Sequence, residues 1–222
     1  MIVQSMTPEE VYREIDRDMP DISSWWMRER KMLTRIAKAT TWRFPFTRWY
    51  EHTSKRGNRY MVMSILMGRK YNDENLTSVF ALQKLERGHA VYFTRWPWQR
   101  VANRIVELPH VFDRYADPKR GNVQKTGIEL IKHFVERNAY GEPTADQRFS
   151  GRSVRYKGRD NVCLSVRDGV LLGEQVGDIF VAHTFITYDM ASGLQRKEFE
   201  KNKDKLLSNQ EIQQQIKWMY NI

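Results

Sequence analysis

Residues 161–188 read NVCLSVRDGVLLGEQVGDIFVAHTFITY, and this stretch decides the fold. It divides into three runs rich in apolar and β-branched residues: Asn161–Arg167, Val170–Gln175 and Ile179–Tyr188. Asp168-Gly169 lies between the first two runs, and Asp-Gly between alternating runs is the strongest short-range signal of a β-hairpin. Gly177-Asp178 marks the next turn. With a further strand at Ser153–Tyr156, the stretch predicts an antiparallel meander over about residues 152–188.

A second set of strands is predicted in the first half of the chain. Its four β-branched or aromatic runs are Thr47–Thr53, Tyr60–Met67, Thr77–Leu85 and Ala90–Trp96. Short polar segments that contain Gly or Asn separate them, as expected for the turns of a meander. The sequence therefore predicts an α+β fold with two antiparallel β-meanders, at about 46–96 and 152–188, intervening helices, a helical N-terminal annex and C-terminal helices.

The N-terminal annex is predicted to contain two helices. Thr7-Pro8-Glu9-Glu10 has a capping residue, a proline at the first helical position and a glutamate at the third, which is typical of a helix start. We expect this helix to end near Asp18, because Pro20 follows it. Ser23 or Ser24 can then cap a second helix that continues to about Ala39.

Two helices are predicted between the meanders. The first covers Trp98 to about Tyr115, and Pro109 should either kink it or begin a new helix. The second covers Lys125–Asn138 and ends in the breaker run Asn138–Pro143. The tail from Leu194 is charged and helical in pattern. These elements predict three parts: a helical annex at 1–42, an α+β core domain at 43–192 and a C-terminal helical segment at 193–222.

Composition narrows the class of protein. The chain has 222 residues, of which 41% are hydrophobic and 12% aromatic, so it can bury a core and is not disordered. No apolar run approaches the roughly 18 to 20 residues of a membrane span, and the N-terminus lacks the pattern of a signal peptide. Cys163 is the only cysteine. We expect a soluble cytoplasmic protein without an intramolecular disulfide, in which Cys163 is a buried thiol.

The formal charge of +10 is concentrated in residues 23–100, which carry 16 Lys/Arg against five Asp/Glu. Six of the seven tryptophans lie in the same block. Arginine suits phosphates and aromatic rings suit unpaired bases, so the block could form a surface for single-stranded nucleic acid. Aromatic residues of a basic protein are, however, usually core residues that arginine stems cover, and this interpretation is the favoured one. The candidate nucleic-acid contacts in this block are Arg95, Trp96, Trp98 and Arg100.

Several chemistries lack their motifs. The sequence contains no GxGxxG after a strand, no phosphate loop, no HExxH, no GxSxG and no paired CxxC. The five histidines are scattered, and the spacing of none of them indicates a metal site. The sequence therefore indicates no cofactor and no metal.

Two of the predicted helical segments carry His-x-x-x-Arg: His110 with Arg114 and His133 with Arg137. On a helix, this spacing places an imidazole and a permanent cation on one face, as metal-free phosphodiester cleavage requires. The order of elements around His110, a helix, a second helix and a meander that ends in Val181–Thr187, resembles the small RNase-toxin group typified by barnase, EndoU, colicin and RelE-like domains. The resemblance covers about residues 105–190.

That resemblance implies a cleft that cuts RNA without a metal. It makes His110 the general acid or base, Arg114 the phosphate clamp and Thr184 or Thr187 the strand hydroxyl. Strand alternation places Thr187 with His183 and Phe185, and Thr184 with Ile186, so only one of the two threonines can face a cleft. Additional contacts to nucleic acid are assigned to Arg137, Lys119 and Arg120.

Two hypotheses remain open from sequence. The first is an RNase-like or toxin-like enzyme acting through His110 and Arg114 on RNA rather than DNA, for which a neutralising protein partner would be expected. The second is a non-catalytic protein that binds single-stranded nucleic acid, or a scaffold protein of a mobile element. Each of these residues can also have a purely structural role. His110 can bond the backbone of a first helical turn, and His133 can be a packing histidine. Asp113 or Glu136 can pair with the arginines.

Overall fold

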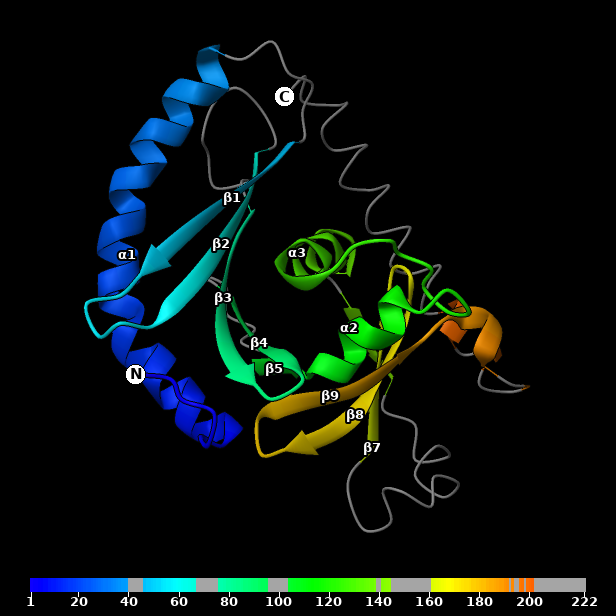
Figure 1. Cartoon of the computed structure of the whole chain (residues 1–222). Coiled ribbons are helices and arrows are strands. Elements are labelled where there is room, and N and C mark those ends of the chain that lie inside the picture. Colours follow the sequence, from blue (N-terminus) through cyan, green and yellow to red (C-terminus); the bar gives the residue numbers. More distant parts are fainter. Residues whose placement is uncertain are drawn as a thin grey trace. The chain divides into compact units, whose positions relative to one another are not determined.

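The computed structural model describes residues 1–39, 46–66, 76–95, 104–138, 141–144, 161–191, 193, 196–197 and 199–201. The chain forms two compact units, Met1–Arg104 and Ile105–Asn221. Each unit combines antiparallel strands with helices (Figure 1), so the α+β class predicted from sequence is confirmed. The three-part division at residues 42 and 192 stays a prediction.

The first unit is a meander with one long helix. Its elements are α1 (Pro8–Ala39), β1 (Phe46–Thr53), β2 (Arg59–Leu66), β3 (Leu76–Leu85) and β4 (Gly88–Arg95). The strands pair antiparallel in the order β1-β2-β3-β4, which confirms the predicted meander. The predicted strand ends agree to within about two residues, because Gly and Asn turns end the alternating runs.

The prediction that Pro20 ends the first helix is wrong, because α1 continues through it. A proline removes one backbone donor and costs about 3 kcal/mol inside a helix. Tertiary contacts on both sides offset this cost: Ile15 before the proline and Ile22 and Trp26 after it are buried. The hydroxyl of Ser24, which was predicted as a cap, instead donates to the carbonyl of Pro20 at 2.9 Å.

Two buried carboxylates join α1 to the turn between β1 and β2. Asp18 accepts bonds from Ser54 (2.8 Å), Asn58 (2.6 Å) and Tyr60 (2.8 Å). Glu14 accepts two bonds from Nη2 of Arg56, at 2.9 and 2.8 Å. These bonds from Arg56, with a further contribution from the amino group of Met1, lower the pKa of Glu14 to about 2. The hairpin is thus fixed to the helix by polar contacts that sequence patterns do not reveal.

The tryptophans that the structure describes in this unit make contacts within it. Trp26 is buried. Trp25 stacks on His52 with ring centroids 4.5 Å apart, and Trp49 lies 5.7 Å from Phe80. These contacts fit the core interpretation of the aromatic block rather than a platform for bases.

In the part of the second unit that the structure describes, five strands combine with helices, and the described residues between 193 and 201 are helical as well. Its elements are β5 (Arg104–Glu107), α2 (Pro109–Ala116), α3 (Gly127–Asn138), β6 (Gly141–Thr144), β7 (Asn161–Val166), β8 (Gly169–Val176), β9 (Ile179–Ile186) and the 3-10 helix η3 (Tyr188–Met190). The strand order is β5-β9-β8-β7-β6. The β7-β8-β9 meander confirms the prediction from residues 161–188, with a bulge where β8 changes register at Leu172/Gly173.

Two predictions in this unit are wrong. Residues 104–107 form β5 rather than part of a helix, although a new helix does begin at Pro109, as one of the two alternatives had it. Gly141–Thr144 forms β6 and pairs with β7, where a breaker run was predicted. In both places a strand neighbour supplies hydrogen bonds that local propensity does not anticipate. The predicted strand at Ser153–Tyr156 lies outside the described residues.

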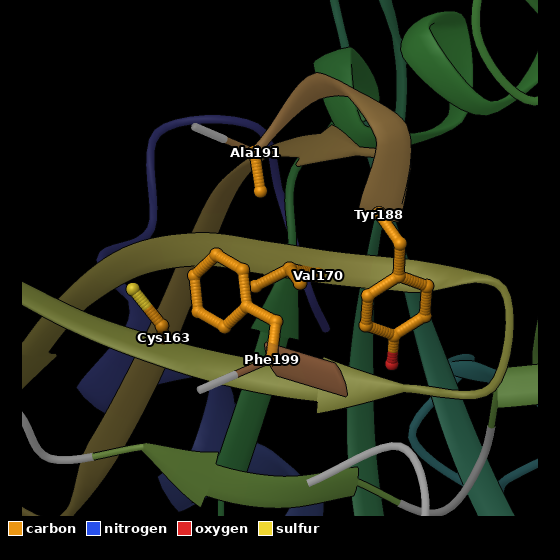
Figure 2. Packing of buried hydrophobic residues seen from close by; sticks show 5 residues of the cluster. All are labelled: Cys163, Val170, Tyr188, Ala191 and Phe199. Atoms are coloured by element: carbon orange, nitrogen blue, oxygen red, sulfur yellow. The ribbon is translucent and has the colours of Figure 1, made fainter. Parts of the chain in front are cut away.

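The β-sheet of this unit has an apolar cluster on each face. On one face, Tyr115 of α2, Phe134 of α3 and Phe185 of β9 meet edge to face, with centroids 4.9 to 6.1 Å apart. Figure 2 shows the cluster on the other face, formed by Cys163, Val170, Tyr188, Ala191 and Phe199. Cys163 is buried within it, as predicted for a structural thiol.

Candidate anion-binding site

A cavity of about 500 Å³ opens in the second unit. Its walls come from the end of α2, the loop to α3, one side of α3, the turn between β7 and β8, and the segment after β9. The lining residues are Tyr115, Arg120, Gly121, Val123, His133, Arg137, Arg167, Asp168, Thr187, Tyr188 and Asp189. Three arginines, a histidine, two tyrosines and a threonine thus converge from parts of the sequence that lie up to 74 residues apart.

Asp168 organises one wall of this cavity. Its carboxylate accepts two bonds from Arg137, at 2.6 Å from Nε and 2.5 Å from Nη2, and one from the hydroxyl of Tyr115 at 2.6 Å. The amide of Asn138 donates to the same carboxylate at 3.3 Å, and Asn138 Oδ1 accepts from the backbone N–H of Asp168 at 3.0 Å. One turn residue therefore holds α2 and α3 to the β7–β8 hairpin.

The hydrogen bonds of this network stabilise the charged forms of Asp168 and Arg137. Partial burial alone would raise the pKa of Asp168, but the bonds from Arg137, Tyr115 and Asn138 lower it below its usual value. The same carboxylate raises the pKa of Arg137. Burial, together with the bond to Asp168, raises the pKa of Tyr115, so this phenol stays protonated. Asp168 and Arg137 form a permanent ion pair, and Arg137 is not an unoccupied clamp.

Both tyrosines are held by the core and present a polar edge to the cavity. The ring of Tyr115 packs against Phe134 and Phe185. Tyr188 belongs to the cluster in Figure 2, and its hydroxyl donates to the carbonyl of Val166 at 2.5 Å. Because both hydroxyls have partners within the protein, these rings fix the shape of the cavity.

The loop after α2 brings Arg120 to the cavity. Backbone N–H groups of Arg120 and Asn122 donate to the carbonyl of Asp117, at 2.9 and 3.0 Å, so the chain turns back on the end of the helix. The turn is so close that a Cβ at Gly121 would lie 2.1 Å from the carbonyl oxygen of Tyr115. Only glycine fits there. Arg120 Nε lies 3.5 Å from Asp117, which orients the guanidinium.

His133 contributes an imidazole to the cavity, and Arg167 contributes a positive charge. Burial, with repulsion from Lys125 and Arg137, lowers the pKa of His133 below its usual value of 6.5. Both effects favour the neutral form of the imidazole, which has a nitrogen lone pair that can accept a proton. Arg167 is exposed and has no ion pair among the described residues. The guanidinium of Arg167 can therefore pair with a bound anion.

The predicted pair of His110 and Arg114 does not line this cavity. His110 is exposed on the first turn of α2, and its Nε2 accepts a bond from Arg114 Nε at 3.0 Å. The two side chains therefore lie close together on one face of the helix, as predicted. However, Arg114 also lies 3.8 Å from Asp117, so both the lone pair and the cation already have partners within the helix and its end.

The two predicted threonines lie on opposite faces of β9 and its continuation. Phe185 contacts Tyr115, whereas Ile186 packs on the cluster of Figure 2, so alternation places Thr184 on the latter face. Thr187 lines the cavity and Thr184 does not.

Of the predicted nucleic-acid contacts, Arg137 and Arg120 line the cavity, whereas Lys119 is exposed in the loop beside it. Arg95 is the last residue of β4, in the other unit. Trp96, Trp98 and Arg100 lie outside the described residues.

The lining residues that sequence reasoning missed include Tyr115, His133, Arg167 and Asp168. The second His-x-x-x-Arg, at His133 and Arg137, was the signal that could have found one of them. Asp168 was assigned to the turn alone; it does form the turn, but its side chain also binds Arg137. Nothing in the local sequence distinguishes that second role, because its partners lie 30 to 53 residues away.

Comparison with protein-family models, curated proteins and solved structures finds no match to this chain. Among the described residues, no three His, Cys, Asp or Glu side chains are grouped as metal ligands would be. Within the same part of the chain, no helix has the length and apolar character needed to cross a membrane.

Proposed function

We propose that this protein acts on RNA and that the cavity of the second unit binds a phosphate of the strand. The observation that carries the proposal is the convergence of Arg120, Arg137 and Arg167 on one cavity of about 500 Å³. Guanidinium groups match phosphate oxygens in charge and in hydrogen-bond geometry. Thr187 adds a hydroxyl that can donate to the same group.

Within this site, Arg120 and Arg167 are the arginines that recognise the ligand. Asp168 neutralises Arg137, so that arginine shapes the site rather than supplying net charge. Arg167 has no such partner in the described residues. Arg120 pairs with Asp117 at 3.5 Å, but Arg114 shares that carboxylate at 3.8 Å, so one negative charge faces two guanidinium groups. An RNA phosphate would therefore sit between the loop after α2 and the β7–β8 turn.

The proposal is tested by anisotropy of a labelled single-stranded RNA. We expect Arg120→Gln with Arg167→Gln to weaken binding by roughly tenfold and to lower the salt slope by about one to two units. The matched control is Arg13→Gln with Lys84→Gln, which removes two exposed charges from the other unit. If both double variants weaken binding equally, the cavity is not the site and the proposal is wrong.

Metal-independent cleavage is a second candidate function, favoured by one observation. A neutral imidazole at His133 and a hydroxyl at Thr187 line the same cavity as the arginines. A base of this kind can take the 2′-hydroxyl proton as the 2′-oxygen bonds to phosphorus, and the guanidinium groups stabilise the phosphorane charge. The P–O5′ bond then breaks, and the imidazolium or water returns a proton to the leaving 5′-oxygen. On this mechanism, cleavage of a generic RNA persists with a chelator and is lost in His133→Ala but not in His110→Ala. Cleavage that depends on His110 instead would restore the assignment made from sequence.

A further inference from the structure

The second half of α1 carries a row of cations that the cavity does not involve. Arg28, Lys31, Arg35 and Lys38 follow the spacing i, i+3, i+7, i+10, which places them on one side of the helix. All four are exposed. At a rise of about 1.5 Å per residue the row extends over about 15 Å. We refer to these four residues as the α1 basic row.

The helix segregates its charges along its length. Up to Asp21, α1 and its cap region carry six Asp/Glu and two Lys/Arg; beyond Asp21 the helix carries five Lys/Arg and one Glu. The carboxylates of the first half are used within the unit, as Glu14 and Asp18 show. The basic row makes no ion pair with any residue that the structure describes. Its charges therefore face solvent.

Helix electrostatics explain only part of this arrangement. Cations in the last turn interact favourably with the helix dipole, which accounts for Lys38. The effect falls off within one turn, so it does not account for Arg28 and Lys31, which lie eight or more residues before Ala39. The helix dipole therefore does not explain why the cationic face extends toward the middle of α1.

The kind of partner follows from what surrounds the row. The apolar side of α1 is buried within the unit through Ile22, Trp26 and Leu33. Only Met27 and Met32 of its large apolar side chains are exposed, which is little apolar surface for insertion into lipid. Trp25 stacks on His52 and Trp26 contacts Tyr50, so neither ring is presented as a platform for unpaired bases. A row of cations on one side of a helix, without stacking rings, suits the regularly spaced phosphates of a duplex.

We propose that the α1 basic row binds the phosphate backbone of double-stranded nucleic acid. This contact is independent of base sequence, because the row reaches phosphates and not base edges. It is separate from the proposed RNA site in the second unit and stands or falls without it.

The test is binding of a labelled 20-base-pair RNA duplex at several salt concentrations. Changing all four residues to Gln (R28Q, K31Q, R35Q, K38Q) should weaken binding roughly tenfold or more and lower the salt slope by about three units. The matched control removes four exposed cations elsewhere (K84Q, R87Q, R196Q, K197Q) and should change both quantities less. Exchanging Arg28 and Arg35 for Lys keeps the charge and should keep binding. Circular dichroism confirms that each variant remains folded.

Three outcomes decide the proposal. If the row variant loses the duplex while the Arg120 and Arg167 variant keeps it, the proposal is supported even if the single-strand site fails. If the row variant and the control lose duplex affinity equally, net charge alone accounts for binding and the proposal is overturned. It is also overturned if the row is needed for binding phosphatidylserine vesicles but not the duplex, since Met27 and Met32, exposed beside it, would then contact lipid.

Discussion

Asp168 connects a turn, two helices and a cavity through one carboxylate. Substituting Asn keeps the size of the side chain but removes the charge that Arg137 and Tyr115 bind. We expect Asp168→Asn to lower the free energy of unfolding by about 2 kcal/mol, because the partly buried guanidinium and phenol lose a charge-assisted partner. Urea denaturation followed by circular dichroism measures the change.

The control for this substitution is Asp189→Asn, which lies at the same cavity. The side chain of Asp189 is 89% exposed, and it pairs with Arg196 at 3.6 Å. Its replacement should change stability by less than about 0.5 kcal/mol. Equal effects of the two substitutions would show that Asp168 does not have the structural role assigned to it.

At the same scale, the sequence predicted residue types of the site better than their positions. It anticipated a phosphate clamp, a strand hydroxyl and a histidine–arginine pair, and Arg137 and Thr187 do line the cavity. It placed the histidine at His110, because the element order favoured that helix. The two histidine–arginine pairs have the same spacing. Which pair faces a cavity depends on the apolar side of its helix and on the loop that follows, and a five-residue motif shows neither.

Elements were predictable where the sequence supplies both alternation and turn residues. β7, β8 and β9 agree with prediction because Asp168-Gly169 and Gly177-Asp178 separate alternating runs. β5 and β6 are four residues each, too short for a periodic pattern, and depend on pairing with distant strands. α1 was predicted as two helices because local propensity at Pro20 is strong and the contacts that override it are long-range.

Pro20 offers a prediction about the whole of α1. Since the proline is accommodated and not required, Pro20→Ala should restore one backbone hydrogen bond and raise the free energy of unfolding by about 1 to 3 kcal/mol. Thermal unfolding measures this as a higher midpoint. Ser24→Ala serves as the control for the hydroxyl bonded to the Pro20 carbonyl and should have a small effect of opposite sign. A lower midpoint in Pro20→Ala would mean that the helix needs the proline.

For the molecule as a whole, acid should weaken both units through their paired carboxylates. The pKa of Glu14 is about 2 in the folded chain and that of Asp168 is also below its usual value. A carboxylate with a lowered folded pKa stabilises the protein above its ordinary pKa, and this stability is lost as the pH falls toward the folded value. The free energy of unfolding should therefore decrease between about pH 4.5 and pH 2.

Glu14→Gln separates this effect from general acid repulsion in the first unit. The variant should be less stable than the parent by about 1 to 3 kcal/mol at pH 7, with the difference shrinking toward pH 2. Tryptophan fluorescence reports on this unit, where Trp25, Trp26 and Trp49 lie. Glu51→Gln is the control, because that carboxylate is 63% exposed. A constant difference across the range would contradict the role of Glu14.

The four-residue network of Tyr115, Arg137, Asn138 and Asp168 also has an evolutionary consequence. Losing the arginine leaves a partly buried carboxylate without its cation, and losing the aspartate leaves the arginine and phenol without theirs. Single changes are therefore costly in either direction, whereas a joint change of partners can be neutral. Selection acts on these positions as one unit, so they should covary among descendants of this sequence, while the exposed residues of the same cavity are free to diverge with the ligand.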